Sequence, residues 1–257
     1  INRPNVTNNE LNDLIRQDPS LAGRVLHIAN SPFYGGRFQA RRISDAIVRM
    51  GMRQLRNILV VAATGELFDV RDPIVRGFWD HALTVATLGD RIASELSLAD
   101  TEEVFIAGLL HDIGKFIIYQ QHPAPYSDVI QQAQASGRRL IDVEDELFKY
   151  FNHVTIGGIA IRRWKLADAV AETARYHHVA EREIPPGMEN TNLVCVVTLA
   201  NVLVKAIAQG EPVPAPETLV QLACVQQLRL TPGRLAALTR SATEWCPHAE
   251  GLMALEA

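Results

Sequence analysis

Six metal-capable side chains recur through the middle of this chain. They form a single histidine, a His-Asp pair, a second single histidine and a His-His pair: His81, His111, Asp112, His153, His177 and His178. Neutral imidazole and carboxylate are the usual ligands of Zn, Mn, Fe and Ni in proteins. Residues so far apart in the sequence can share an ion only where several segments converge. The series therefore predicts a fold that buries a divalent-metal site among its elements.

The segments that carry these residues have a helical pattern. Apolar residues recur at helical spacing over about 76–96, 102–119, 126–136, 142–148, 153–164, 167–178 and 192–208. No alternating strand pattern with hairpin turns separates these segments. We predict an all-α fold, a multi-helix bundle joined to an N-terminal helical lobe.

Two breaks in the pattern predict the domain organisation. Asp72-Pro73 separates an N-terminal lobe from the His-rich part, and three prolines mark residues 209–216 as a linker. We predict an N-terminal helical lobe over residues 1–72 and a helical lobe with the His/Asp series over 73–209. A C-terminal extension over 210–257 would hold a final helical pair.

Composition limits the function classes. With 257 residues and 47% hydrophobic content, the chain can bury a substantial core. A net charge of -4 gives no overall electrostatic case for nucleic acid or an anionic membrane as partner. The apolar runs over 57–63 and 193–208 look too short or too interrupted to cross a bilayer, and no signal peptide opens the chain. The three cysteines form no CxxC pair, so we expect reduced thiols and a cytoplasmic protein.

A local basic patch near Gly51 is the exception to this charge balance. It consists of Arg37, Arg41, Arg42, Arg49, Arg53 and Arg56, and a DNA-binding helix-turn-helix can be drawn over residues 44–61. The second of these helices is as apolar as a core helix, and no set of base-reading side chains stands out. Arginines on solvated helix faces explain the patch more simply. Contact of this patch with a protein or a nucleotide is more expected than DNA binding, so a nucleic acid partner is not favoured.

The segment AGLLHDIGK, residues 107–115, carries the most specific signal. An apolar helix delivers His111 and Asp112 into its last buried turns, where a charge without a partner is costly. A metal ion would compensate Asp112, and Lys115, one turn further on, would offer a cation to an anionic ligand. The segment resembles the HD superfamily of metal-dependent phosphohydrolases.

This resemblance implies a ligand set and its roles. The superfamily pattern is an early His, a His-Asp doublet and a late Asp, and bimetallic members add a single His and a His-His pair. It implies one or two divalent ions (Fe, Mn, Zn or Ni) bound by His81, His111, Asp112, His153, His177, His178 and Asn201. If the chain is an enzyme, Asp112 would bridge the metals and Lys115 would steady a phosphate oxygen.

The chain departs from the enzymatic pattern at three places. Asn201 replaces the late Asp, and a neutral amide binds metal more weakly and gives less help in deprotonating bound water. The segment HHVAEREIPPG lacks the Gly-Tyr-Pro signature of the cyclic-dinucleotide phosphodiesterases. Gly77 stands where some of those enzymes carry a Glu. These departures favour a domain that binds metal without turnover.

Five ordered blocks narrow the resemblance further. DPSLAGRVLHIANSPFYG, ISDAIVRMGMRQLRNILV, FWDHALTVA, AGLLHDIGK and HVTIGGIAIRRWKLADAVAETARYHHV resemble the HDOD domain of bacterial signalling proteins, over roughly residues 10–205. The resemblance implies a non-catalytic output domain that acts through protein partners, often downstream of a response-regulator receiver or a sensor domain. Because the chain opens on Ile1, we expect a fragment of a longer protein. The alternative is a metal-dependent phosphohydrolase acting on a nucleotide or cyclic dinucleotide.

Overall fold

The computed structural model describes residues 15, 22–23, 25–26, 29–30, 39–52, 55, 71–98, 101–208 and 213–249. By its internal contacts the chain divides into two compact units, residues 1–70 with 247–257 and residues 71–246. The second unit carries the entire His/Asp series. The division into 1–72, 73–209 and 210–257 stays a prediction.

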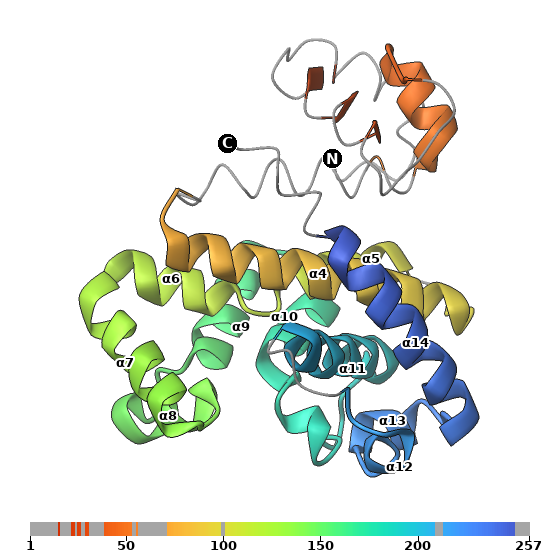
Figure 1. The fold of residues 1–257 in the computed structure, drawn as a ribbon. Coiled ribbons are helices and arrows are strands. Elements are labelled where there is room, and N and C mark those ends of the chain that lie inside the picture. Colours follow the sequence, from red (N-terminus) through yellow and green to blue (C-terminus); the bar gives the residue numbers. More distant parts are fainter. Residues whose placement is uncertain are drawn as a thin grey trace. The chain divides into compact units, whose positions relative to one another are not determined.

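The all-α prediction is confirmed, because the described residues form helices and no strands. The larger unit is drawn in Figure 1 from α4 onward. Its helices are α4 (Pro73–Glu95), α5 (Thr101–Leu110), α6 (Ile113–Gln121), α7 (Pro123–Ser136), α8 (Leu140–Phe148), α9 (His153–Arg163), α10 (Asp168–Tyr176), the 3-10 turn η1 (Val179–Glu181), α11 (Thr191–Ala208), α12 (Pro216–Leu219), α13 (Ala223–Gln227) and α14 (Pro232–Ala249).

Helix ends follow capping chemistry where the sequence supplies it. The Asp72 carboxylate accepts hydrogen bonds from the backbone N–H groups of Ile74 and Val75, and Pro73 takes the first helical position of α4. Gly137 ends α7 in the left-handed conformation, with φ 63°. Local sequence therefore fixes the entry into the longest helix of this unit and the turn that follows α7.

Two helix predictions are wrong. The single helix expected over 102–119 breaks at His111 and Asp112, and Asp112, with φ -104° and ψ 13°, leaves the helical region between α5 and α6. The expected C-terminal pair is three helices, α12, α13 and α14. Apolar periodicity continues across both breaks, so periodicity alone does not reveal them.

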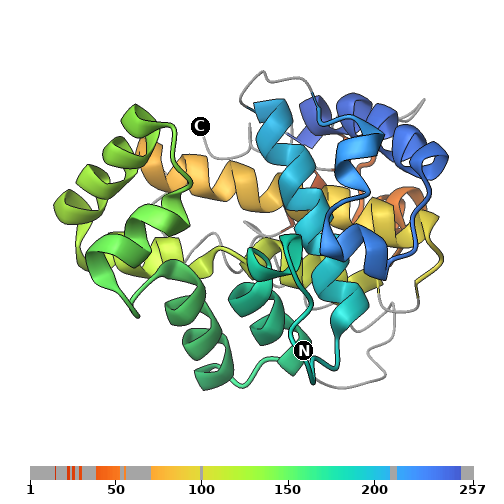
Figure 2. The ribbon, with the colours of Figure 1, turned by 90° about the horizontal axis from the view of Figure 1, so that it is seen from below.

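Helix α11 is the core helix of this unit. By length and composition it could cross a membrane, with a mean hydropathy of 1.8, which corrects the expectation from its sequence. Of that window 67% is buried, because α11 packs against α4, α5, α10 and α13. Figure 2 shows it running through the helices of the unit. The apolar residues of α11 are therefore those of a buried core helix.

Two glycines let the helices that carry the His/Asp series approach closely. A Cβ added to Gly108 would lie 2.7 Å from Cα of Ala86, so α5 crosses α4 at a position without room for a side chain. A Cβ on Gly114 would lie 1.9 Å from the carbonyl oxygen of His153. The first turn of α6 is therefore in backbone contact with the start of α9. These contacts bring distant parts of the series together.

In the smaller unit, the described core includes Val25, Ala29, Ile43, Ala46 and Leu55. Arg49, from the predicted basic patch, donates hydrogen bonds to the Ala29 carbonyl at 2.9 Å and to Asn30 Oδ1 at 3.0 Å. Its guanidinium therefore holds two segments of this unit together.

Two other members of the patch, Arg41 and Arg42, are exposed. Arg37, Arg53 and Arg56 lie outside the described residues, as do residues 53–54 and 56–61 of the helix-turn-helix drawn over 44–61.

Candidate metal centre

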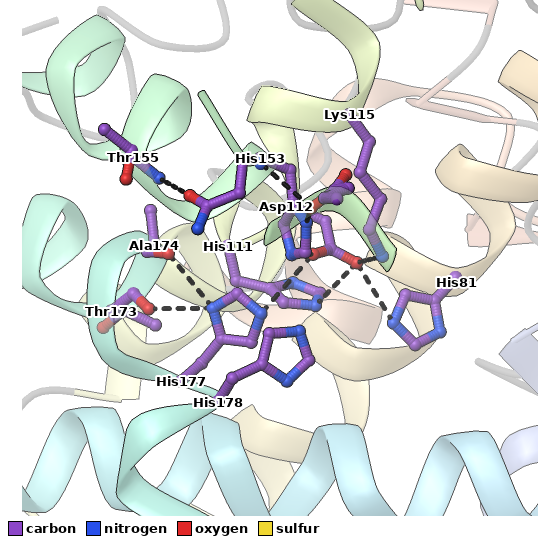
Figure 3. A network of polar contacts seen from close by, with 12 residues as sticks. His81, His111, Asp112, Lys115, His153, Thr155, Thr173, Ala174, His177 and His178 are labelled. Carbon is purple, nitrogen blue, oxygen red and sulfur yellow. Dashed lines mark hydrogen bonds and ion pairs between the residues drawn. The ribbon is translucent and has the colours of Figure 1, made fainter. Parts of the chain in front are cut away.

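The His/Asp series converges in one place in the larger unit, as Figure 3 shows. His81 comes from α4, His111 and Asp112 from the α5–α6 junction, and His153 from the first position of α9. His177 and His178 directly follow α10. The side chains of His111, His153 and His177 are fully buried, while that of His81 is 19% exposed. The fold thus assembles a buried polar cluster from four separate segments.

Asp112 lies at the middle of this cluster and divides it into two halves. Its Oδ2 lies 3.5 Å from Nε2 of His81 and 3.2 Å from Nε2 of His111. Its Oδ1 lies 3.4 Å from Nε2 of His153 and 3.5 Å from Nε2 of His177. We call His81, His111 and Asp112 the first half, and Asp112, His153, His177 and His178 the second half; each has the spacing of a metal-ligand group.

Backbone carbonyls fix the proton positions on two of the rings. Nδ1 of His111 lies 2.6 Å from the Gly108 carbonyl oxygen, and Nδ1 of His177 lies 3.1 Å from that of Thr173. A carbonyl oxygen only accepts, so each Nδ1 carries the proton. Burial lowers the pKa of His177 to about 3, so this ring is neutral near pH 7. Its Nε2 then presents a lone pair to Asp112.

Carboxylates hold the other two rings of the second half. Glu144 Oε2 accepts from Nδ1 of His153 at 2.5 Å and from its backbone N–H at 3.2 Å. Tyr126 donates its hydroxyl to the other oxygen of Glu144. Nδ1 of His178 lies 3.3 Å from Oε1 of Glu181. Such carboxylate–histidine pairs orient metal ligands and raise their basicity.

Opposing effects set the charge state of the buried carboxylates. Burial favours the neutral form of Glu144, but the His153 ring and its hydrogen bonds keep the pKa of Glu144 below its usual value. Burial likewise opposes ionisation of Asp112, yet His111 and Lys115 hold the pKa of Asp112 well below its usual value. Both groups are therefore carboxylates at neutral pH.

The donor atoms fit a metal ion. Within the part of the chain that the structure describes, no hydrogen-bond partner reaches Nε2 of His81, His111, His153 or His177, or Oδ1 of Asp112. Buried lone pairs that face an ionised carboxylate are costly unless a cation lies between them. Two ligands at about 2.0–2.1 Å from one tetrahedral ion lie about 3.3–3.4 Å apart. The observed separations of 3.2–3.5 Å match that value.

Lys115 adds positive charge at the centre, and Lys205 interacts with it electrostatically. Lys115 Nζ lies 2.5 Å from Oδ2 of Asp112 and is largely buried. Lys205, one turn beyond Asn201 on α11, interacts electrostatically with both Lys115 and Asp112. Burial and then the Lys115 charge lower the pKa of Lys205 to about 8, against the opposing effect of Asp112. Sequence reasoning identified Lys115 and missed Lys205.

Asn201 is fully buried on α11. Neither its amide oxygen nor its amide nitrogen has a hydrogen-bond partner among the residues whose placement is described. An amide with both polar atoms unpaired in a core is costly, and an ion or water that uses its oxygen would remove part of that cost. The part of Asn201 in the ligand set stays a prediction.

The HDOD domain family matches residues 1–180, which is more than half of the chain. This chain belongs to the HDOD domain family. The resemblance of its five blocks to HDOD is confirmed, and the His-Asp doublet, His81, His153 and His177 all fall within the matched residues. The match ends before Asn201 and Lys205.

One relative and three solved structures show the range of similar proteins. The HDOD chain is 27% identical over 242 residues to an uncharacterized protein of Treponema pallidum (strain Nichols), covering 90% of this chain and 45% of that protein. It thus spans less than half the length of that relative. An HDOD domain protein of unknown function from Geobacter sulfurreducens is 25% identical, with a TM-score of 0.79 over 98% of this chain and 88% of that one.

The other two structures show the likeness of fold. A protein from Shewanella amazonensis SB2B named "Putative phosphohydrolase" is 23% identical, with a TM-score of 0.77 over 100% of this chain and 90% of that one. A protein from Marinobacter aquaeolei VT8 named "Putative signal transduction protein" is 21% identical, with a TM-score of 0.76 over 98% of this chain and 55% of that one. Proteins with both kinds of name therefore share this fold.

Proposed function

We propose that this HDOD chain is a cytoplasmic signalling output module that acts through protein partners, and that its His/Asp centre holds one or two divalent transition-metal ions. The observation that carries the metal is the set of histidine Nε2 atoms facing Asp112 without a hydrogen-bond partner among the described residues. The signalling role is supported by the family and by the name of the Marinobacter aquaeolei protein. An upstream receiver or sensor domain would supply the input to such a module.

The two halves of the centre would hold separate ions. His81, His111 and Asp112, with Asn201, would hold one, and the other would lie with Asp112, His153, His177 and His178. The choice among Fe, Mn, Zn and Ni is open to histidine and carboxylate ligands. Such an ion, when bound, supplies a Lewis acid and lowers the pKa of a bound water.

A metal-linked fold suits a signalling module. The ligands come from α4, the α5–α6 junction, α9 and the end of α10, so a filled centre would cross-link four segments. Ligand binding to the folded state alone stabilises it, by about 2.7 kcal/mol at a hundredfold excess over Kd. Gain or loss of metal would therefore change how firmly these helices are held together.

A second candidate function is hydrolysis of a nucleotide or cyclic dinucleotide. Lys115 favours it, because an ammonium group 2.5 Å from Asp112 suits a phosphate ligand, and the charge of Lys205 acts on the same two side chains. In that reaction Lys115 would steady a phosphate oxygen and Asp112 would bridge the two halves. The neutral Asn201 weighs against turnover, because it removes a carboxylate that would help to deprotonate water.

Elemental analysis combined with a phosphodiesterase screen tests these proposals. We expect the purified protein to contain a transition metal and to hydrolyse no nucleotide or cyclic dinucleotide, with or without Asn201→Asp. His153→Ala should lose metal, and His122→Ala, at an exposed histidine outside the centre, should retain it. Hydrolysis by the wild type would favour the second candidate. Failure of the wild type to take up Zn, Mn, Fe or Ni would overturn the metal centre.

A further inference from the structure

Exposed large hydrophobic side chains are concentrated in one short segment. Among the described residues, seven such side chains are exposed, and only Val48 lies outside residues 147–166. The other six, with their exposed fractions, are Leu147 (47%), Tyr150 (83%), Phe151 (70%), Ile159 (56%), Trp164 (45%) and Leu166 (39%). Scattered apolar residues are ordinary on a surface, whereas a concentration of them marks an interaction site.

The same segment is strongly basic. Residues 147–166 contain four basic residues, Lys149, Arg162, Arg163 and Lys165, and no Asp or Glu, in a chain of net charge -4. All four basic residues are exposed. Local charge therefore has the opposite sign to that of the whole protein, and it accompanies the apolar side chains.

Helix α9 organises this surface. His153, Gly157 and Ile161 are buried on its inner side, and the helix packs against α6 and α10. Ile159 and the two arginines of the last turn are exposed. Tyr150 and Phe151 precede the helix, and Trp164 and Leu166 follow it, so exposed apolar side chains lie at both ends. Figure 2 shows α9 at the periphery of its unit.

We propose that this surface, the α9 surface of residues 147–166, docks a protein partner through an amphipathic segment that carries acidic side chains beside apolar ones. The proposal rests on the proposed action through protein partners and names the chemistry of that partner. Trp, Tyr and Arg are the side chains that dominate protein interfaces energetically. The excess of four positive charges favours an acidic partner.

The composition favours protein over nucleic acid. Single-stranded nucleic acid is bound by stacking its bases on aromatic rings. Leu147, Ile159 and Leu166 are aliphatic, and such side chains offer a base no ring to stack on. An apolar face on a partner helix or strand would bury them together with the aromatic side chains.

The α9 surface and the candidate metal centre share one stretch of the chain. Glu144 on α8 accepts two hydrogen bonds from His153, and the stretch between these helices carries Tyr150 and Phe151. A partner that contacts these two rings would change the conformation of the stretch that positions His153. By linkage, metal in the second half would then change the affinity for the partner by the same factor as the partner changes the affinity for metal.

A designed peptide pair tests the docking surface on the full, metal-loaded chain. One labelled helical peptide carries Leu and Trp on one face and Glu elsewhere, and its twin carries Lys in place of Glu. Fluorescence anisotropy should show that the Glu peptide binds at least about tenfold more tightly, since charge sets partner selection. Ile159→Ser combined with Phe151→Ser, and Arg162→Glu combined with Arg163→Glu, should each weaken binding by about tenfold or more.

Matched controls lie on other surfaces. Val48→Ser removes the one other exposed large hydrophobic side chain among the described residues, and Arg229→Glu with Arg240→Glu reverses two exposed charges elsewhere. Both controls should retain peptide binding. Circular dichroism should show that the surface variants fold, because the substituted side chains are exposed. Equal binding of the two peptides, or equal loss in the controls, would overturn the proposal.

Other occupants give distinguishable results. A dimer in sedimentation that Ile159→Ser abolishes would assign the surface to a second copy. Binding of phosphatidylcholine–phosphatidylglycerol vesicles or of single-stranded DNA, lost in the same variants, would assign it to a membrane or to nucleic acid. Each of these results would overturn an acidic protein partner. Normal metal content without peptide binding would contradict only the proposed docking surface. Peptide binding by a protein that takes up no metal would contradict only the proposed metal centre.

Discussion

The two halves of the His/Asp centre differ in how firmly the protein holds their ligands. In the second half, Nδ1 of every histidine has an acceptor: Glu144 for His153, the Thr173 carbonyl for His177 and Glu181 for His178. In the first half, only His111 has one. His81 is partly exposed, and its Nδ1 makes no hydrogen bond within the described part of the chain. We therefore expect the second half to bind metal more tightly, because its rings are already oriented.

The largest expected effect comes from the residue that the halves share. Asp112→Asn removes the only carboxylate that faces both groups of Nε2 atoms in the described centre. Loss of this charge should weaken metal binding in both halves by more than about 100-fold, exceeding the effect of removing an outer partner of a ligand. Metal content after dialysis measures the change, and Asp128→Asn, at an exposed carboxylate on α7, is the control. Retention of one full equivalent would show that the halves are independent.

Glu144→Gln should separate the halves. The amide can still accept from His153, but it lacks the charge that raises the basicity of the ring, so affinity in the second half should fall about 10–100-fold. Calorimetric titration should show one weakened site and one unchanged. Glu146→Gln alters an exposed carboxylate on the same helix and should leave both sites intact. Equal weakening of both sites would contradict the assignment of Glu144 to the second half.

Asn201→Asp should reduce the difference in metal affinity between the two halves. If Asn201 belongs to the first half, a carboxylate there adds one negative charge beside His81 and His111 and should raise affinity in that half about tenfold. Competition with a calibrated chelator measures the change. Asn192→Asp, at an exposed position of the same helix, is the matched control. An unchanged first half would place Asn201 outside the ligand set.

Sequence reasoning identified the candidate metal ligands of the centre, but not the side chains that hold these candidates in place. His111, Asp112 and the other histidines stand out because such residues are conspicuous among apolar neighbours. Glu144 does not, because Asp142, Asp145 and Glu146 surround it, and only the packing of α8 selects one acid for burial. The helix break at His111 is likewise set by tertiary contacts, including the approach of Gly114 to α9. Lys205 lies in the last turn of the apolar helix α11, and nothing in its local sequence connects it with Asp112.

A separate effect is expected on the pH dependence of stability without metal. Burial holds the pKa of His178 and His81 well below the ordinary 6.5, and it lowers that of His177 to about 3. Above the unfolded pKa of about 6.5, all three rings are neutral in both states and their contribution to stability is complete. As the pH falls below that value, the unfolded chain binds protons that the native chain does not, so stability is lost toward the folded pKa of each ring.

We expect urea unfolding of the protein, after a chelator has removed its metal, to show a free energy of unfolding that falls as the pH is lowered from 7.5 to 5. The fall should be up to about 1.4 kcal/mol per pH unit for each histidine. The second half holds two of these three rings, so His177→Gln with His178→Gln should flatten the slope more than His81→Gln does. His122→Gln, at an exposed ring, should leave the slope unchanged. If His81→Gln flattened the slope as much as the double substitution does, the two halves would contribute equally to the pH dependence of stability.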